Sequence, residues 1–170
     1  QVDLVDTGVL PRRVLDAVGE IAAGRPELRI LADSRRSLRG YPPVSLKMNR
    51  AELGMLLDET PPGDLRQTKR AARELARRGG RDVFVTLAEQ GLIGASPGGD
   101  VTHLPVLPIR GPIDIVGAGD AVTANLTAAL AAGASLREAL ELANAAASVV
   151  IHQLGTTGTA SVGQIAETIA

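Results

Sequence analysis

The sequence predicts an α/β fold with a largely parallel sheet, and three observations support this prediction. Short runs rich in Val, Ile and Leu alternate along the chain with longer helical segments, as a parallel sheet requires. Ser, Asp or Asn followed three positions later by Glu or Gln stands where several helical segments begin. The length of 170 residues and the hydrophobic content of 45% suit a single domain, residues 1–170, with a substantial core.

The first half of the chain is expected to alternate strands with helices. Pro11 opens the first helix, and Gly24 closes it. Asp64 and Gln67 predict a capping box at the start of the third helix. The expected strands cover residues 2–6, 28–33 and 44–49, and the expected helices cover residues 11–23, 50–57 and 64–78.

The second half begins with a β-branched strand over 82–88, and "GLIGAS" with "VTHLPVLP" predicts a hairpin or a meander beyond it. Residues 105–112 contain three prolines and are expected to form an edge or a connecting loop, because proline cannot donate to a central sheet. Two alanine-rich helices follow, over 118–132 and 135–153. Ser135 with Glu138 predicts a capping box for the second of them.

Charge and composition exclude several functions. Lys plus Arg number 18 against 19 Asp plus Glu, so the net charge of -1 gives no general attraction to nucleic acid or an anionic membrane. Tyr41 and Phe84 are the only aromatic residues, too few to stack on bases. The absence of cysteine excludes disulfides and thiolate metal sites and fits a cytoplasmic location, and no apolar run approaches the length of a membrane span.

The run "DIVGAGD" carries the strongest chemical signal. Its glycines predict a turn that opens a helix, whose first backbone amides attract phosphate. The run lacks the third small residue of a dinucleotide-binding turn and the Gly-Lys-Ser/Thr of a P-loop. We interpret the amides of Gly117, Ala118 and Gly119 as a site for a transferring phosphoryl group. Asp120 is then the base that accepts the proton of the attacking hydroxyl, or, as the alternative, an ordinary helix-start residue.

The surrounding sequence resembles the carboxyl-terminal half of the ribokinase-like, PfkB-type carbohydrate kinases. The resemblance rests on "DIVGAGDAVTANLTAALAAG", "SLREALELANAAASVVIHQLGTTG", the Asn-x-x-Glu element in "KMNRAELG" and the nucleotide loop in "VTLAEQG". These motifs have the family's order and spacing and cover nearly the whole chain. Among subfamilies, they are most similar to the heptose-phosphate kinases of lipopolysaccharide precursor synthesis. The resemblance implies a ribokinase-like three-layer sandwich.

The resemblance also implies an enzyme that phosphorylates a hydroxyl on a sugar or sugar phosphate, with ATP and Mg2+ as cofactors. It makes Asp120 the general base and the turn amides an anion hole. Asn49 and Glu52 would serve the phosphates and the magnesium ion, Glu52 through water, although "NRAE" is also an ordinary helix cap.

Further site residues follow from the same resemblance. Thr86 and Gly91 would line the nucleotide site, and Asn144 would lie near the adenine. Asp114 would help to bind a monovalent cation such as K+, together with carbonyls around Gly155. The alternatives are that Thr86 is an ordinary strand residue, that Asn144 serves packing or capping, and that Asp114 is a solvated turn residue.

Asp33 and Arg35 resemble an Asp-x-basic element at the carboxyl end of a strand, where ligands of open α/β sheets gather. His103 and His152 are too isolated to suggest a metal pair.

The sequence departs from the family pattern at four positions. Ile115 stands where Thr, Pro, Val or Ser is usual, and Ala88 stands where the nucleotide loop usually has Gly. Lys47 and Met48 replace a commoner Thr-Pro. These changes leave the base in place but point to a divergent acceptor or relaxed nucleotide binding.

Kinases of this family are nearly twice as long as this chain, and their first half supplies amino-terminal strands, a sugar-binding region and a β lid. We expect those parts to be missing here, which would leave a long sheet edge exposed. The chain is therefore expected to belong to a longer chain, or to form a homo-oligomer or pair with another polypeptide.

Two other functions stay open. The first is a non-catalytic nucleotide-binding or oligomerisation module derived from such a kinase, favoured by the missing half and by Ile115 and Ala88. The second is a kinase of the same fold that acts on a nucleoside or vitamin alcohol.

Overall fold

The computed structural model describes residues 10–34 and 37–170. The strand expected over 2–6, and Arg35, therefore lie outside the described residues. The chain divides into two compact units, each of which is described by itself. Unit 1 comprises Gln1–Thr86 with Gly94–Val101, and unit 2 comprises Leu87–Ile93 with Thr102–Ala170.

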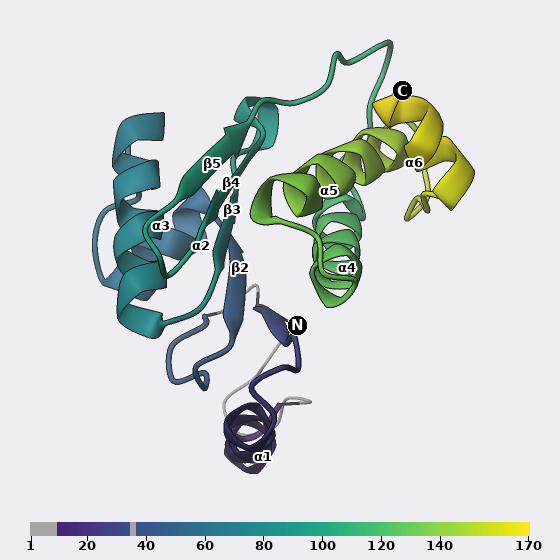
Figure 1. The fold of residues 1–170 in the computed structure, drawn as a ribbon. Helices are drawn as coiled ribbons and strands as arrows, with labels where there is room; N and C mark the ends of the chain where they lie inside the picture. Colours follow the sequence, from purple (N-terminus) through teal and green to yellow (C-terminus); the bar gives the residue numbers. More distant parts are fainter. Residues whose placement is uncertain (1–9, 35–36) are drawn as a thin grey trace. The chain divides into compact units, whose positions relative to one another are not determined.

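All five strands lie between α1 and α4 in the chain, mixed with helices, and the described residues end with three successive helices (Figure 1). The strands are β1 (Leu31–Asp33), β2 (Ser45–Asn49), β3 (Val83–Thr86), β4 (Leu92–Ala95) and β5 (Val101–Leu104). The helices are α1 (Arg12–Gly24), α2 (Arg50–Leu57), α3 (Leu65–Gly79), the short 3-10 helix η1 (Ala88–Gln90), α4 (Ala118–Ala131), α5 (Leu136–Ile151) and α6 (Val162–Ile169).

The five strands form one sheet in the order β1-β2-β3-β4-β5. The first two pairs are parallel: Asp33 is opposite Lys47, and Asn49 is opposite Thr86. A turn in which the Ser96 amide donates to the Asp100 carbonyl joins β4 to β5, which is the predicted hairpin. The α/β prediction is confirmed, and the carboxyl ends of β1, β2 and β3 lie at the same edge of the sheet.

In unit 1, α3 packs its small residues against β3. Thr68, Ala72 and Ala76 are fully buried, and their spacing of four places them on one face of the helix. Phe84, on β3, and Met48, on β2, are among the largest fully buried side chains. The core of this unit therefore combines large strand residues with a flat, small-residue helix face.

In unit 2, α4 packs on α5, and α5 packs on α6. Ala139, Ala143 and Ala146 of α5 are fully buried, and side chains this small let neighbouring helices approach closely. Ile165 of α6 packs with Ala146 in a buried cluster. The sequence analysis did not predict α6.

The lengths of several elements differ from the predictions. β1 begins at Leu31 instead of residue 28, and β3 ends at Thr86 because Ala88–Gln90 turns into η1. α5 ends at Ile151. Residues 105–112 contain no strand, as their prolines predict.

The two predicted capping boxes have different outcomes. At α5 the Ser135 side chain accepts from the Glu138 amide, and the Glu138 carboxylate accepts from the Ser135 amide. At α3 the Asp64 carboxylate accepts from the Gln67 amide at 2.7 Å, but the Gln67 side chain accepts from the Gly63 amide instead of returning to Asp64. Of these two predicted boxes, only the one at α5 is therefore reciprocal.

The reciprocal box makes part of the stability of α5 sensitive to acid. Hydrogen bonds from the Ser135 hydroxyl and amide lower the pKa of the Glu138 carboxyl. A lowered folded-state pKa gives stability that is complete above the ordinary glutamate pKa and is lost as pH falls through the lowered value.

We therefore expect Ser135→Ala to reduce the free energy of unfolding more near pH 7 than at a pH low enough to protonate Glu138 in both proteins. Urea unfolding across that pH range measures the difference between the two proteins. A difference that stays constant with pH would show that Glu138 takes no part in the cap. Ser161→Ala is the matched control, because Gln164 completes the α6 capping box without a titratable group.

Candidate active site

In unit 1, three polar residues lie at the carboxyl ends of neighbouring parallel strands. Asp33 ends β1, Asn49 ends β2 and Thr86 ends β3. Asn49 and Thr86 are direct register partners, and the Thr86 hydroxyl lies 3.5 Å from the Met48 carbonyl. Ligands of open α/β sheets bind beyond this edge, so the edge is a candidate ligand site.

Asn49 and Glu52 form a reciprocal cap at the start of α2. The Asn49 Oδ1 atom accepts from the Glu52 amide at 2.9 Å, and the Glu52 Oε2 atom accepts from the Asn49 amide at 2.7 Å. The structure therefore brings these two predicted site residues together. Among the described residues, the hydrogen bonds of the Glu52 carboxylate are confined to this cap, through one of its two oxygens.

A partly buried ion pair joins the first two strands. Lys47 Nζ is 2.9 Å from Asp33 Oδ2, and the side chains are 8% and 23% exposed. The pair joins β1 to β2 through their register partners. Sequence analysis treated Lys47 only as a departure from the family pattern, because the pairing register that places it opposite Asp33 is not readable from local sequence.

In unit 2, Gly91 belongs to a tight loop. The Leu87 amide donates to the Gly91 carbonyl at 2.8 Å, and Gly91 has φ of +89°. A Cβ added to Gly91 would lie 2.0 Å from the Leu104 carbonyl oxygen, so glycine is required here by the neighbouring backbone. Ala88 has φ of +49°, a left-handed conformation that explains why glycine suits that position.

Asn144 is buried on α5 and donates to the Pro105 carbonyl at 2.8 Å. Gly91 packs against the same residue, since its added Cβ would lie 2.8 Å from the Pro105 carbonyl carbon. The structure thus brings Gly91 and Asn144 together on either side of Pro105.

The "GAGD" turn opens α4 as predicted. Gly117 is the N-cap with φ of +86°, and Asp120 is an exposed residue of the first turn. No side chain caps this helix. The Ala118 amide donates to the Ile115 carbonyl at 3.2 Å, so the amides of Gly119 and Asp120 are the ones that the turn leaves without a capping acceptor.

Asp114 connects the turn to the segment after α5. Its Oδ1 atom accepts from the Val116 amide at 3.0 Å, and its Oδ2 atom accepts from the Gly155 amide at 3.1 Å. The structure therefore brings Asp114 and Gly155 together. The contact uses the Gly155 amide rather than a carbonyl.

The segment after α5 also contacts the turn directly. A Cβ added to Gly117 would lie 2.9 Å from the Thr157 methyl group. Gln153 closes this segment into a loop, accepting from the Thr159 amide at 3.0 Å and donating to the Thr159 carbonyl at 2.7 Å. The run "LGTTG" belongs to the family resemblance, but no role was predicted for Gln153 or Thr157. The glycines around this threonine pair are the signal that marks a packed loop.

The two histidines have structural partners. The His152 Nε2 atom accepts from the Arg110 amide at 3.2 Å, and the Nδ1 atom lies 2.6 Å from the Ser148 carbonyl oxygen. His103 Nε2 lies 2.7 Å from the Gln90 carbonyl. Within residues 10–34 and 37–170, no group of three or more His, Cys, Asp or Glu side chains could hold a metal ion.

The predicted site residues thus fall into two sets. Unit 1 holds Asn49, Glu52 and Thr86 at its sheet edge. Unit 2 holds Asp114 and residues 117–120 at the start of α4, and Gly91 and Asn144 at Pro105.

Fold and motifs define a family of small-molecule kinases. Residues 32–162 match the pfkB family of carbohydrate kinases, which is more than half of the chain, and the chain belongs to this family.

Curated relatives share the match. The chain is 37% identical to the bifunctional protein HldE of Azorhizobium caulinodans over 153 residues, covering 88% of this chain and 31% of that protein. It is 51% identical to HldE of Pectobacterium atrosepticum over 75 residues, which cover 44% of this chain and 16% of that protein. The chain thus spans about a third or less of the length of these relatives.

Solved structures confirm the ribokinase-like fold. A ribokinase of Arabidopsis thaliana, complexed with ribose and ATP, matches with a TM-score of 0.77 at 23% identity, over 93% of this chain and 51% of that chain. Phosphofructokinase-2 of Escherichia coli, in complex with potassium, matches with a TM-score of 0.66 at 27% identity, over 74% of this chain and 40% of that chain. In the part of the chain that the structure describes, no helix is long and apolar enough to cross a membrane.

The close approach at Gly91 gives a testable prediction. Gly91→Ala should lower the free energy of unfolding by about 3 kcal/mol or more, because the new methyl group meets the Leu104 carbonyl in addition to the strained φ. Gly99→Ala is the matched control: its φ is +97°, but nothing lies within 4 Å of the added atom, so a loss of about 1 kcal/mol is expected. Urea unfolding of both variants measures the two losses. Equal losses of unfolding free energy in the two variants would show that the loop moves to accept the added methyl group without destabilising the protein.

Proposed function

We propose that this chain supplies the nucleotide-binding and catalytic part of an ATP-dependent kinase that phosphorylates a hydroxyl group of a sugar or sugar phosphate. The observation that supports the proposal best is the start of α4, where the exposed residue Asp120 lies in the same turn as two uncapped amides. Membership of the carbohydrate kinase family supports the same reaction.

The turn can serve two partners at once. The amides of Gly119 and Asp120 point along the positive end of α4, which favours a phosphoryl oxygen. Among the described residues, no hydrogen bond or ion pair holds the Asp120 carboxylate, so it is open to an acceptor hydroxyl. In the proposed step, Asp120 accepts the hydroxyl proton as the oxygen bonds to the γ-phosphorus. The bond from that phosphorus to the bridging oxygen breaks, and ADP leaves.

Asn49 and Glu52 fit a role beside the nucleotide phosphates. The cap uses only one Glu52 oxygen, so the second remains available for a water bound to Mg2+, which keeps several waters in its coordination shell. When bound, Mg2+ would neutralise phosphate charge. Thr86 lies next to Asn49 at the same sheet edge, which suits a contact to the nucleotide.

Asp114 fits a cation site only indirectly. Both carboxylate oxygens of Asp114 accept hydrogen bonds from backbone amides, those of Val116 and Gly155. Asp114 would therefore hold these two segments in place, and backbone carbonyls would bind K+. The similar Escherichia coli phosphofructokinase-2 has been solved with potassium, which makes K+ the monovalent ion to test.

Heptose 7-phosphate is the acceptor that the resemblance favours. The HldE relatives, with the heptose-phosphate kinase character of the "ANAAA" and "LGT" runs, support it. A panel of sugars and sugar phosphates, assayed with ATP and Mg2+ on the full-length protein that carries this sequence, tests the acceptor. ATP binding without turnover on any acceptor would favour the non-catalytic module.

Asp120→Asn separates catalysis from binding. Turnover of the full-length protein should fall about 100-fold or more, the range that loss of a general base spans, while ATP affinity stays nearly unchanged. Steady-state kinetics and nucleotide titration measure the two quantities. Near-normal turnover would eliminate Asp120 as the base and leave it a helix-start residue.

Glu52→Gln separates the metal role from the cap. Glutamine also completes a capping box, so stability should stay within about 0.5 kcal/mol of wild type. Loss of the charge should raise the Mg2+ concentration that half-saturates the reaction. An unchanged Mg2+ requirement, with unchanged unfolding, would reduce Glu52 to a cap.

A further inference from the structure

The outer face of α3 carries an unusual concentration of positive charge. This helix of 15 residues contains six Arg and Lys side chains and one acidic residue, Glu74. The whole chain has 18 Lys plus Arg, so one third of them lie on this helix. We call the set Arg66, Lys69, Arg70, Arg73 and Arg77 the α3 basic face.

The fold does not account for these charges. The opposite side of α3, with Thr68, Ala72 and Ala76, already supplies the packing against the sheet. Arg66, Arg70 and Arg73 are exposed. Among the described residues, the only ion pair made by a basic side chain of α3 is the one between Arg78 and Glu74, at 3.5 Å.

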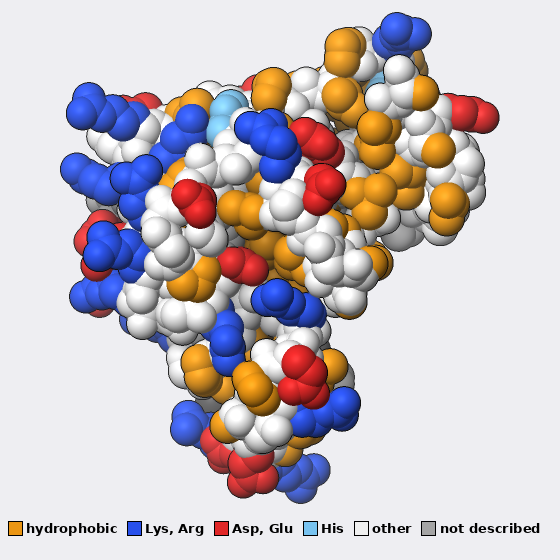
Figure 2. Space-filling view, viewed as in Figure 1, with side chains coloured by type: hydrophobic (Ala, Val, Ile, Leu, Met, Phe, Trp, Pro, Cys, Tyr) orange, Lys and Arg blue, Asp and Glu red, His pale blue; other side chains and the backbone are white. Residues whose placement is uncertain are grey.

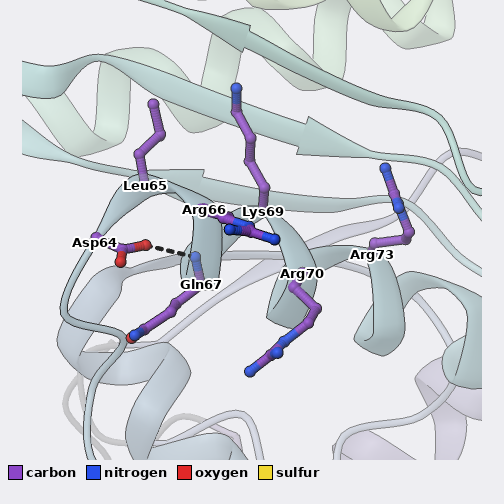
Figure 3. Close-up of a pocket in the computed structure, with 7 residues that line it drawn as sticks. All are labelled: Asp64, Leu65, Arg66, Gln67, Lys69, Arg70 and Arg73. Carbon is purple, nitrogen blue, oxygen red and sulfur yellow. Dashed lines mark hydrogen bonds between the residues drawn. The ribbon is translucent and has the colours of Figure 1, made fainter.

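The basic side chains line hollows in the surface of unit 1. One hollow is bounded by the cap and the first turns of α3, and Figure 3 shows Lys69 and Arg70 extending from the helix in opposite directions there. A second hollow lies between α3 and the segment after α2, and Arg70 and Arg73 line it as well. Figure 2 shows blue side chains gathered over the side of the molecule where α3 lies.

We propose that the α3 basic face is a docking surface for an acidic segment of a protein partner. The charges from Arg66 to Arg77 span 11 residues, about 16 Å along the helix axis, which matches about three turns of a partner helix that carries carboxylates on one side. Complementary charge of this kind sets partner choice and the rate of association.

Carboxylates beside the basic face favour a narrow partner. Asp64 borders the first hollow, and Glu59 and Glu74 border the second. A broad anionic membrane or a long phosphate backbone would extend beyond the basic face and meet these carboxylates, whereas a segment of about three helical turns matches the length of the basic face alone. A second copy of this chain is a poor match, because no helix in the described residues carries more than two acidic side chains.

Charge reversal on the face tests the proposal. The probe is a labelled, glutamate-rich helical peptide of about 20 residues, long enough to form a helix, titrated against the whole chain. The triple variant Arg66→Glu/Arg70→Glu/Arg73→Glu should bind it roughly tenfold more weakly or worse. The same peptide with Gln in place of Glu should bind neither protein.

A matched variant controls for net charge. Arg12→Glu/Arg13→Glu/Arg137→Glu makes the same change in charge on α1 and α5 and should keep most of the affinity. Thermal unfolding confirms that both variants fold. Equal losses in the two variants, absence of peptide binding to the unchanged chain, or stronger binding to duplex DNA or to phosphatidylserine vesicles would each overturn the proposal. Kinase activity is not required for any of these measurements.

Discussion

The first backbone amides of an α-helix need acceptors from outside the helix, and this requirement organises the chain. Side chains meet it at four helix starts: Asn49 for α2, Asp64 for α3, Ser135 for α5 and Ser161 for α6. Gly117 has no side chain with which to meet it at α4. The first amides of α4, beside Asp120, therefore stay open to an acceptor from outside the helix. The need for acceptors at helix starts thus underlies both the caps of the fold and the proposed phosphate site.

Local chemistry made much of the fold predictable. Pro11, the reciprocal pair Ser135 and Glu138, and the turn at Gly117 each carry their signal within a few residues, and each predicted helix start lies within a residue of the observed one. Helix α6 was missed although Ser161 and Gln164 give the same capping signal, because it has only eight residues. Strand lengths were less predictable, since they depend on pairing with distant partners.

The sequence indicated which candidate site residues lie near one another, but not the contacts that hold them there. Asn49 and Glu52 were assigned together, and the structure shows that they bond to each other. The Lys47–Asp33 pair and the packing of Gly91 on Leu104 both depend on elements distant in sequence. Gly91 illustrates the difference, because the family pattern suggested a glycine for ligand approach whereas the structure shows a second reason, the neighbouring carbonyl. The roles of Thr86, Gly91 and Asn144 toward a nucleotide stay predictions.

The carboxylate of Asp114 accepts amides from two segments that are 39 residues apart in sequence, at Val116 and at Gly155. Opening the loop after α5 therefore also releases the residues that lead into α4, so the two segments share one local unfolding event rather than fraying independently. A sequence change in the loop after α5 would then also alter the geometry of the α4 start. Substitutions near Gly155 are for this reason not neutral surface changes, even though they lie far along the chain from Asp120.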